Sequence, residues 1–247
     1  LQCSGAGPRG RFGHSATVVS RGPGSSAVMV VHGGKVQSGP NHAPDNTTFV
    51  LELRNDKPHW RKAEVLNGPG SPVPRWGHSA VYIGDVPTSA AWSSVRNRDI
   101  KSGILVFGGD CGGMMNDLMF LDVATETWLP LQVRCKDKPL ARRNHTACTS
   151  GQHMYVFGGR GGTEDFLQDL WSLDLNSLTW QQLQPRGSIP AARTGHTAVL
   201  CQDKMIVFGG FCGTPHVRTF FADVHAYDIC TQEWAVVNTT SSPTDPM

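Results

Sequence analysis

Residues 142–183 read RRNHTACTSGQHMYVFGGRGGTEDFLQDLWSLDLNSLTWQQL, and the pattern of this stretch indicates the class of fold. Its short runs are rich in β-forming residues or alternate between apolar and polar residues, and turn residues separate them. This pattern predicts four antiparallel strands. Gly158 and Gly159 end the most apolar run, where glycine permits backbone conformations closed to other residues and a close approach of neighbouring sheets. We expect this stretch to form one four-stranded sheet.

The same order of residues occurs four times along the chain. Each copy contains a His-Ser or His-Thr pair, an apolar run, a Gly-Gly pair, an acidic residue and a Trp. The copies are His14-Ser15, Gly33-Gly34, Glu52 and Trp60; His78-Ser79, Gly108-Gly109, Asp122 and Trp128; His145-Thr146, Gly158-Gly159, Asp174 and Trp180; and His196-Thr197, Gly209-Gly210, Asp228 and Trp234. A repeat of about 50 residues is typical of a β-propeller, whose small sheets bury their faces by stacking in a ring. We therefore predict an all-β propeller in which each Trp packs one blade on the next. The predicted blades cover about residues 11–66, 75–133, 142–184 and 193–237.

The pattern resembles the kelch repeat. The resemblance is carried by the Gly-Gly pair, by the acidic residue six positions before Trp in three copies, and by the Arg-x-x-His opening of each copy. The first copy departs most from the pattern, because His32 precedes its Gly-Gly pair where the other copies have Phe. The stretches 48–53, 58–61 and 75–78 are also similar to F-box/kelch proteins, and kelch-domain substrate receptors outside that group are similar too. This resemblance implies a kelch β-propeller that serves as the substrate receptor of a ubiquitin ligase.

Both ends of the chain fit the same repeat. Leu1-Gln2 matches the Leu-Gln pairs that follow Trp128 and Trp180, so we expect residues 1–10 to be the tail of a preceding blade. Met247 stands where the next opening Arg is due. We therefore expect four blades of a larger ring of five to seven blades, completed by other parts of the same chain or by a neighbouring subunit. A free-standing four-bladed ring is the alternative.

Composition narrows the class of protein. Hydrophobic residues make up 39% of the chain, and no run approaches the roughly 20 apolar residues needed to span a bilayer. The formal net charge of +2 gives no global attraction to nucleic acid or to acidic membranes. The seven cysteines are odd in number and contain no CxxC pair, which favours reduced thiols. We expect a cytoplasmic protein without nucleic-acid or membrane partners, with a nuclear or ciliary location as alternatives.

The candidate binding site is a set of loops at one end of the predicted propeller. In a meander the first strand starts where the second strand ends, so the residues before each His and after each Gly-Gly pair surround the mouth of the central channel. Arg forks among aromatic rings suit a peptide that carries an acidic residue or a free C-terminal carboxylate. The candidate partner-binding residues are Phe12, Arg75, Trp76, Arg142, Arg143, Asn144, Arg160, Thr194, Phe211 and Arg218. The repeat-opening arginines, which include Arg75 and Arg142, have the alternative role of tying blades together.

The sequence contains no pattern for catalysis, metal binding or a cofactor. The repeat histidines occur in every copy, so we expect each to cap a strand start by a hydrogen bond, and no HExxH motif, GxSxG elbow or P-loop is present. Asp223 and His225 share one face of a third strand, where we expect them to be polar surface residues. We therefore predict a non-catalytic protein-interaction module without cofactors. The alternatives are a structural scaffold subunit of a large cytoskeletal or ciliary assembly and, less favoured, a kelch-type enzyme.

One insertion interrupts the second copy between Gly84 and Gly103. It joins a first strand to a second strand, so it leaves the blade on the face opposite the mouth. Loops of this length in compact domains are usually functional or disordered. We expect a mobile loop, with a second docking site as the alternative.

Overall fold

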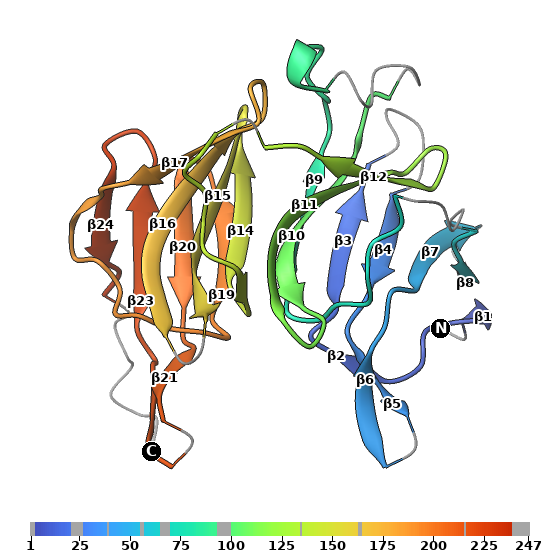
Figure 1. The fold of residues 1–247 in the computed structure, drawn as a ribbon, viewed down its shortest axis with the longest axis horizontal. Coiled ribbons are helices and arrows are strands. Elements are labelled where there is room, and N and C mark those ends of the chain that lie inside the picture. Colours follow the sequence, from blue (N-terminus) through green and yellow to red (C-terminus); the bar gives the residue numbers. More distant parts are fainter. Residues whose placement is uncertain are drawn as a thin grey trace.

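The computed structural model describes residues 3–20, 27–38, 40–54, 57–64, 70–92, 100–133, 135–162, 165–214 and 216–238. These residues form an all-β fold whose four main sheets are each built on a meander of four antiparallel strands (Figure 1). The prediction of a kelch propeller fold with four-stranded blades is confirmed. Leu1-Gln2 and Met247 lie outside the described residues.

The blades follow one another in chain order. Blade 1 contains β3 (Ser15–Val19), β4 (Val28–His32), β7 (Thr48–Arg54) and β8 (Lys57–Lys62). Blade 2 contains β9 (Ser79–Ile83), β10 (Gly103–Asp110), β11 (Met114–Asp122) and β12 (Thr127–Leu131). Blade 3 contains β14 (Thr146–Ser150), β15 (His153–Gly161), β16 (Phe166–Asp174) and β17 (Thr179–Leu183). Blade 4 contains β19 (Thr197–Cys201), β20 (Lys204–Phe208), β23 (Val224–Asp228) and β24 (Glu233–Val236).

Shorter elements extend these sheets. The linkers before blades 1 and 4 add a parallel strand to the outer strand of the blade they precede: β1 (Ser4–Gly5) pairs with β8, and β18 (Arg186–Gly187) pairs with β24. At the starts of blades 1 and 3, β2 (Arg11–Phe12) pairs with β5 (Lys35–Ser38), and β13 (Arg142–Arg143) pairs with β15. The β5 strand forms a hairpin with β6 (Asn41–Pro44), and β21 (Phe211–Gly213) forms one with β22 (Arg218–Phe220).

The first strands of consecutive blades lie side by side. Contacts join β3 to β9, β9 to β14 and β14 to β19. In Figure 1 the β5–β6 hairpin and β21 project from the lower end of the molecule, while the 3-10 helix η1 (Ala90–Trp92) lies at the upper end. The lower end is where the opening Arg segments β2 and β13 lie, so it corresponds to the predicted mouth.

In blades 1, 2 and 3 the side chain before the Gly-Gly pair is held between two rings of the following blade. We call this arrangement the inter-blade clamp. The three clamps are His32 with His78 and Trp128, Phe107 with His145 and Trp180, and Phe157 with His196 and Trp234, with ring centroids 4.6–5.4 Å apart. The held side chains are at most 2% exposed. Such ring pairs contribute about 0.5–1.5 kcal/mol each beyond the burial of apolar area, so the clamps join the separate sheets into one core.

Each clamping His also reaches a hydroxyl at the start of the preceding blade. The three hydrogen bonds are His78 Nε2 with Ser15 Oγ at 2.9 Å, His145 Nε2 with Ser79 Oγ at 2.9 Å, and His196 Nε2 with Thr146 Oγ1 at 2.8 Å. Three of the four repeat histidines, His78, His145 and His196, do bond at strand starts as the sequence suggests, but the strand belongs to the neighbouring blade. Burial, followed by the positive charge of Arg193, lowers the pKa of His196 to about 4. Burial likewise holds the pKa of His78 and of His145 well below the usual value.

The described part of the long insertion is anchored. The Trp92 side chain is 1% exposed, packs against Phe120 and donates from Nε1 to the Leu175 carbonyl of blade 3 at 2.5 Å. The Ser89 hydroxyl bonds the Asn176 carbonyl beside it. The expectation of a mobile loop is therefore wrong for residues 84–92, because a buried indole fixes them across two blades. Residues 93–99 lie outside the described part of the chain.

We predict that Phe107→Ala lowers the free energy of unfolding of the 247-residue chain by about 3–5 kcal/mol, because it empties a fully buried clamp. Phe208→Ala is the matched control. Phe208 holds the same repeat position in blade 4 but is 51% exposed, so its loss is expected to change stability by less than about 1 kcal/mol. Urea unfolding monitored by Trp fluorescence measures both variants. Equal losses would contradict the clamp.

We also predict that the clamps weaken in acid. A histidine whose pKa is lower in the folded chain than the unfolded value of 6.5 binds fewer protons when folded, so stability is complete above pH 6.5 and falls as pH drops toward 4. For His196 alone the loss between pH 7.5 and pH 5 is about 2 kcal/mol. His196→Gln is expected to reduce the pH dependence of urea unfolding, and the exposed His42→Gln to leave it unchanged. The same pH dependence in wild type and His196→Gln would refute this.

Candidate partner-binding face

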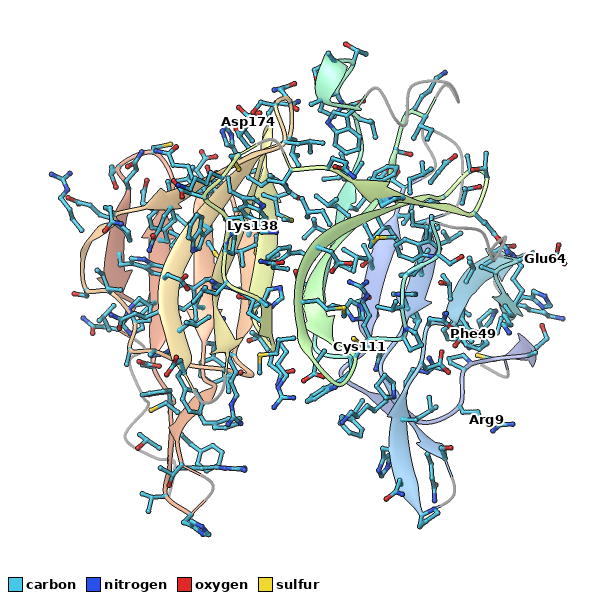
Figure 2. The ribbon with its side chains drawn as sticks, in the orientation of Figure 1. Arg9, Phe49, Glu64, Cys111, Lys138 and Asp174 are labelled. Atoms are coloured by element: carbon cyan, nitrogen blue, oxygen red, sulfur yellow. The ribbon has the colours of Figure 1, made fainter. Side chains whose placement is uncertain are left out.

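The residue after each opening Arg pairs with the residue after each Gly-Gly pair. The four pairs are Phe12 with Lys35, Trp76 with Asp110, Arg143 with Arg160, and Thr194 with Phe211. We call these eight residues, with the neighbouring hairpin residues His42, Phe166, Arg218 and Phe220, the mouth face. Figure 2 labels Cys111, which follows Asp110, toward the end where the hairpins project, and Asp174 at the opposite end.

Glycine geometry creates this pairing. Between Phe157 and Gly159 the ladder of β15 and β16 shifts register, and Gly158 and Gly159 take φ angles of 61° and 99°. If another residue replaced Gly159, its Cβ would lie only 2.7 Å from the Cβ of His145. Only glycine tolerates that conformation and contact, so the strand turns inward and continues beside the Arg segment.

A chain of backbone hydrogen bonds links the mouth across the blades. The amide of Gly77 donates to the Gly13 carbonyl at 2.7 Å, that of Asn144 to Gly77 at 2.7 Å, and that of Gly195 to Asn144 at 3.0 Å. Asn144 takes a left-handed φ of 51° where the other blades have glycine. The half-buried Asn144 is therefore a link in this chain of hydrogen bonds. It is the only one of the four equivalent residues that carries a side chain, because the others are glycine.

The opening arginines are buried inside the blades. The Arg142 guanidinium donates to both Asp169 carboxylate oxygens at 2.8 Å and to the Gly158 carbonyl at 3.0 Å. Arg75 does the same with Asp117 and Gly108, and Arg193 with Asp223 and Gly209. Hydrogen bonds from Arg193 and then from His225 lower the pKa of Asp223 to about 2.

The prediction of partner contact is therefore wrong for three candidate residues. Arg75 and Arg142 are 0% exposed and Thr194 is 2% exposed, so their side chains cannot meet a partner. The two arginines take the alternative role, although each ties together one blade and its entering linker rather than two blades. Thr194 contributes backbone: its amide and carbonyl both pair with Phe211.

The Asp223–His225 pair is also internal rather than a polar surface. His225 is 7% exposed, its Nε2 lies 3.0 Å from Asp223 Oδ2, and its Nδ1 lies 2.9 Å from the Ser188 carbonyl oxygen. In blade 3 the corresponding residue is Trp171, whose Nε1 donates to Asp169 at 2.7 Å. Both rings therefore orient the carboxylate that receives the opening Arg.

On one side of the mouth face, cations stack on Trp76. The Lys35 ammonium lies 4.4 Å and the Arg143 guanidinium 4.6 Å from the Trp76 ring centroid. Phe12 meets the same indole edge-on at 6.1 Å and is 49% exposed. Asp110 accepts from Arg143 Nη1 at 2.5 Å. Such stacking fixes the cations in place at a gain of about 0.5–1 kcal/mol each at exposed sites.

On the other side, three phenylalanines form a strip. Phe166 and Phe211 lie 6.1 Å apart, and Phe211 and Phe220 lie 5.7 Å apart. Arg160 lies over Phe166 at 5.7 Å and Arg218 over Phe211 at 5.1 Å. Because Phe220 is 72% exposed, this strip offers apolar area next to positive charge.

The charges of the mouth face do not balance. Arg143 and Arg160 stand directly opposite each other on paired strands, an arrangement that is unfavourable for like charges. Asp110 compensates Arg143, but among the described residues no carboxylate forms an ion pair with Lys35, Arg160 or Arg218. Arg160 Nε is buried without a hydrogen-bond partner in the described structure. The mouth face is thus suited to an anionic group.

Sequence reasoning missed the Asp110–Arg143 pair and the contribution of Phe166 and Phe220. Asp110 follows its Gly-Gly pair and Arg143 opens the next copy, so their contact depends on how two blades are placed. Phe166 and Phe220 lie in hairpins whose turns cannot be placed from the repeat alone. The sequence offered one indication: in blades 3 and 4 a phenylalanine, Phe166 or Phe220, follows the loop after the Gly-Gly pair.

The described cavities lie away from the mouth face. One of about 930 Å³ is lined by Val19, Arg61, Tyr82, Lys101 and Glu126 among others, at the far ends of β3 and β9. Another, of about 470 Å³, lies between the outer parts of blades 1 and 2, beside Asn46, Lys62 and Trp128. Within the described ranges, no three His, Cys, Asp or Glu side chains are grouped to hold a metal ion, and no helix is long and apolar enough to cross a membrane.

Comparison with known proteins agrees with the kelch propeller fold. The family model described as the KLHDC2/KLHL20/DRC7 Kelch-repeats domain matches residues 91–247. The chain is 32% identical over 225 residues to Adagio-like protein 3 of Oryza sativa subsp. japonica and 30% identical to Adagio protein 3 of Arabidopsis thaliana; each match covers 87% of this chain and 32% of the relative. It is 34% identical over 145 residues to Kelch domain-containing protein 3 of Homo sapiens, covering 58% of this chain and 33% of the relative. The chain thus spans about a third of the length of these curated relatives.

We predict that Arg142 and Arg160, which lie on paired strands, differ in role. Arg142→Gln removes the ion-pair partner of Asp169 in a largely buried site and leaves the carboxylate only the Trp171 hydrogen bond, so it is expected to cost about 3 kcal/mol of folding stability. Arg160→Gln, one strand away and without an ion pair in the described residues, is expected to change stability by less than about 1 kcal/mol. Urea unfolding of the two variants tests this, and a larger loss for Arg160→Gln would reverse the assignment.

Proposed function

The chain belongs to the kelch-repeat family, and on that premise we propose that it is a non-catalytic protein-interaction module that binds a peptide or protein segment on its mouth face. The observation that carries the proposal is the uncompensated positive charge of Lys35, Arg160 and Arg218, which lie over half-buried aromatic rings. Cations that already stack on aromatic rings lose little side-chain entropy when a partner binds. The free-energy cost of binding is therefore smaller, which favours affinity.

The proposed partner carries a carboxylate, either on an acidic side chain or at a free C-terminus. Arg160 is its direct contact, because its guanidinium has no ion pair among the described residues and faces Arg143 across the strand pair. A carboxylate there would relieve the repulsion between the two arginines and accept charge-assisted hydrogen bonds. Arg143 joins the contact while it keeps Asp110.

Aromatic side chains supply the apolar part of the proposed contact. Phe12 and Trp76 form one wall, and Phe211 with the exposed Phe220 forms the other. Such residues dominate interface energies because they bury large areas with few rotatable bonds. The revised set of partner-binding residues is Phe12, Trp76, Arg143, Asn144, Arg160, Phe211 and Arg218, with Lys35, Phe166 and Phe220 added.

The wider role in this proposal is that of a cytoplasmic substrate receptor of a ubiquitin ligase. Its support is the resemblance of the repeats to F-box/kelch proteins. A ligase reconstituted with the complete polypeptide is expected to transfer ubiquitin to a partner bound at the mouth face. Binding without transfer would favour the scaffold alternative, since fold alone does not fix function.

We predict that peptides selected on the chain from a random library are acidic or need a free C-terminal carboxylate. Arg160→Glu is expected to weaken their binding by about tenfold or more, measured by fluorescence anisotropy, because it replaces the attracting charge with a repelling one. Lys138→Glu makes the same charge change at an exposed residue outside the mouth face and serves as the control. Selected peptides without acidic groups, or equal binding by wild type and Arg160→Glu, would refute the proposal.

A further inference from the structure

Blade 1 differs from blades 2 and 3 at three neighbouring positions of its core. In blade 1 these positions hold His32, Thr48, which pairs with His32 in the strand ladder, and Ala63, whose amide donates to the Thr48 carbonyl at 2.8 Å. The same positions hold Phe, Leu and Leu in both of the other blades, namely Phe107, Leu118 and Leu131, and Phe157, Leu170 and Leu183. Blade 1 is therefore smaller and more polar than its neighbours at this place.

These differences coincide with a cavity between blades 1 and 2. In blade 2, Leu118 and Leu131 are at most 7% exposed and belong to the apolar core. In blade 1, Thr48 and Ala63 instead line the cavity of about 470 Å³, together with Trp128 of blade 2. Native cores leave few voids, so the space follows from the smaller side chains. Its volume lies within the range of about 300–1,000 Å³ that is usual for small-molecule sites.

The inner end of the cavity is polar as well as small. His32 Nδ1 lies 3.0 Å from Thr48 Oγ1, and both side chains belong to residues that are 2% exposed. His32 Nε2 has no hydrogen-bond partner in the described structure, and the His32 ring lies 4.6 Å from the Trp128 ring. An unpartnered buried polar group costs free energy, so tight packing of the blades does not account for a histidine here.

The rim of the cavity carries one charge of each sign. Lys62 and Glu64 line it and are exposed, and Figure 2 labels Glu64 at the outer edge of blade 1, apart from Cys111. Within the described part of the chain, neither side chain forms an ion pair. The other lining groups are neutral, so a simple anion or cation would be attracted by one rim residue and repelled by the other.

We propose that this cavity binds a small, neutral polyhydroxyl molecule of about the size of a monosaccharide. A hydroxyl both donates and accepts, so such a ligand can accept from the Lys62 ammonium, donate to the Glu64 carboxylate and bond the Asn46 amide. Trp128 and Pro72 provide an apolar wall for the C–H groups of a sugar ring. None of the lining residues belongs to the mouth face, so this site is independent of the proposed peptide contact.

NMR titration of the ¹⁵N-labelled 247-residue chain with D-glucose, D-galactose and D-mannose tests the proposal. We expect at least one of these sugars to shift the Trp128 indole and Ala63 amide resonances in a saturable way, with a Kd below about 10 mM. Glycine, a zwitterion, and acetate, an anion, are the comparison ligands and are expected to leave both resonances unchanged. The absence of a saturable shift with all three sugars, or a shift with glycine or acetate alone, would overturn the proposal.

Two variants locate the binding. Thr48→Leu combined with Ala63→Leu restores the residues of blades 2 and 3, fills the cavity and is expected to weaken sugar binding about tenfold or more. Glu64→Ala changes only an exposed rim residue and is expected to weaken it about threefold or more. Arg160→Glu on the mouth face is the control and is expected to leave sugar binding unchanged. Equal binding by wild type and either folded variant, or loss of binding in Arg160→Glu, would refute this site.

Discussion

The fold depends on one recurring constraint: in blades 1, 2 and 3 the ring before the Gly-Gly pair must be covered by the following blade. An isolated blade would leave its apolar faces exposed to water, so the sheets are stabilised by stacking on one another. The His and Trp of the next blade close over the ring, and the His hydrogen bond to Ser15, Ser79 or Thr146 fixes how far the blades turn relative to one another. The same constraint keeps the clamping histidines neutral, because a proton there would place a charge in the core.

Strand geometry explains why structural and binding residues alternate along short segments. Arg142 is locked to Asp169 inside blade 3, while the next residue, Arg143, reaches the mouth and meets Trp76 and Asp110 of blade 2. Successive residues of a strand point to opposite faces, so one strand start supplies both the internal tie and the exposed contact. The rigid stack therefore presents variable side chains at fixed positions, as a recognition surface requires.

The repeat predicted the blades and the proximity of the two mouth segments, because both follow from local strand patterns. It could not predict burial at the mouth. Arg75, Arg142 and Thr194 appeared as candidate contacts because exposure depends on partners such as Asp117 and Asp169, which lie 27–42 residues away along the chain. The insertion was misjudged for a similar reason: Trp92 finds its place only against Leu175 of another blade. Features that depend on two blades together were not predicted from one repeat at a time.

In blades 1, 2 and 3 we expect the ring before the Gly-Gly pair to be energetically coupled to the Trp of the next blade. A double-mutant cycle of Phe107→Leu and Trp180→Leu, measured by urea unfolding, tests it most directly, since it isolates the pair from the loss of either side chain alone. We predict a coupling free energy of about 0.5–1.5 kcal/mol in favour of the wild-type pair. A coupling energy indistinguishable from zero would show that the two rings are merely neighbours and that the clamp does not hold the blades together.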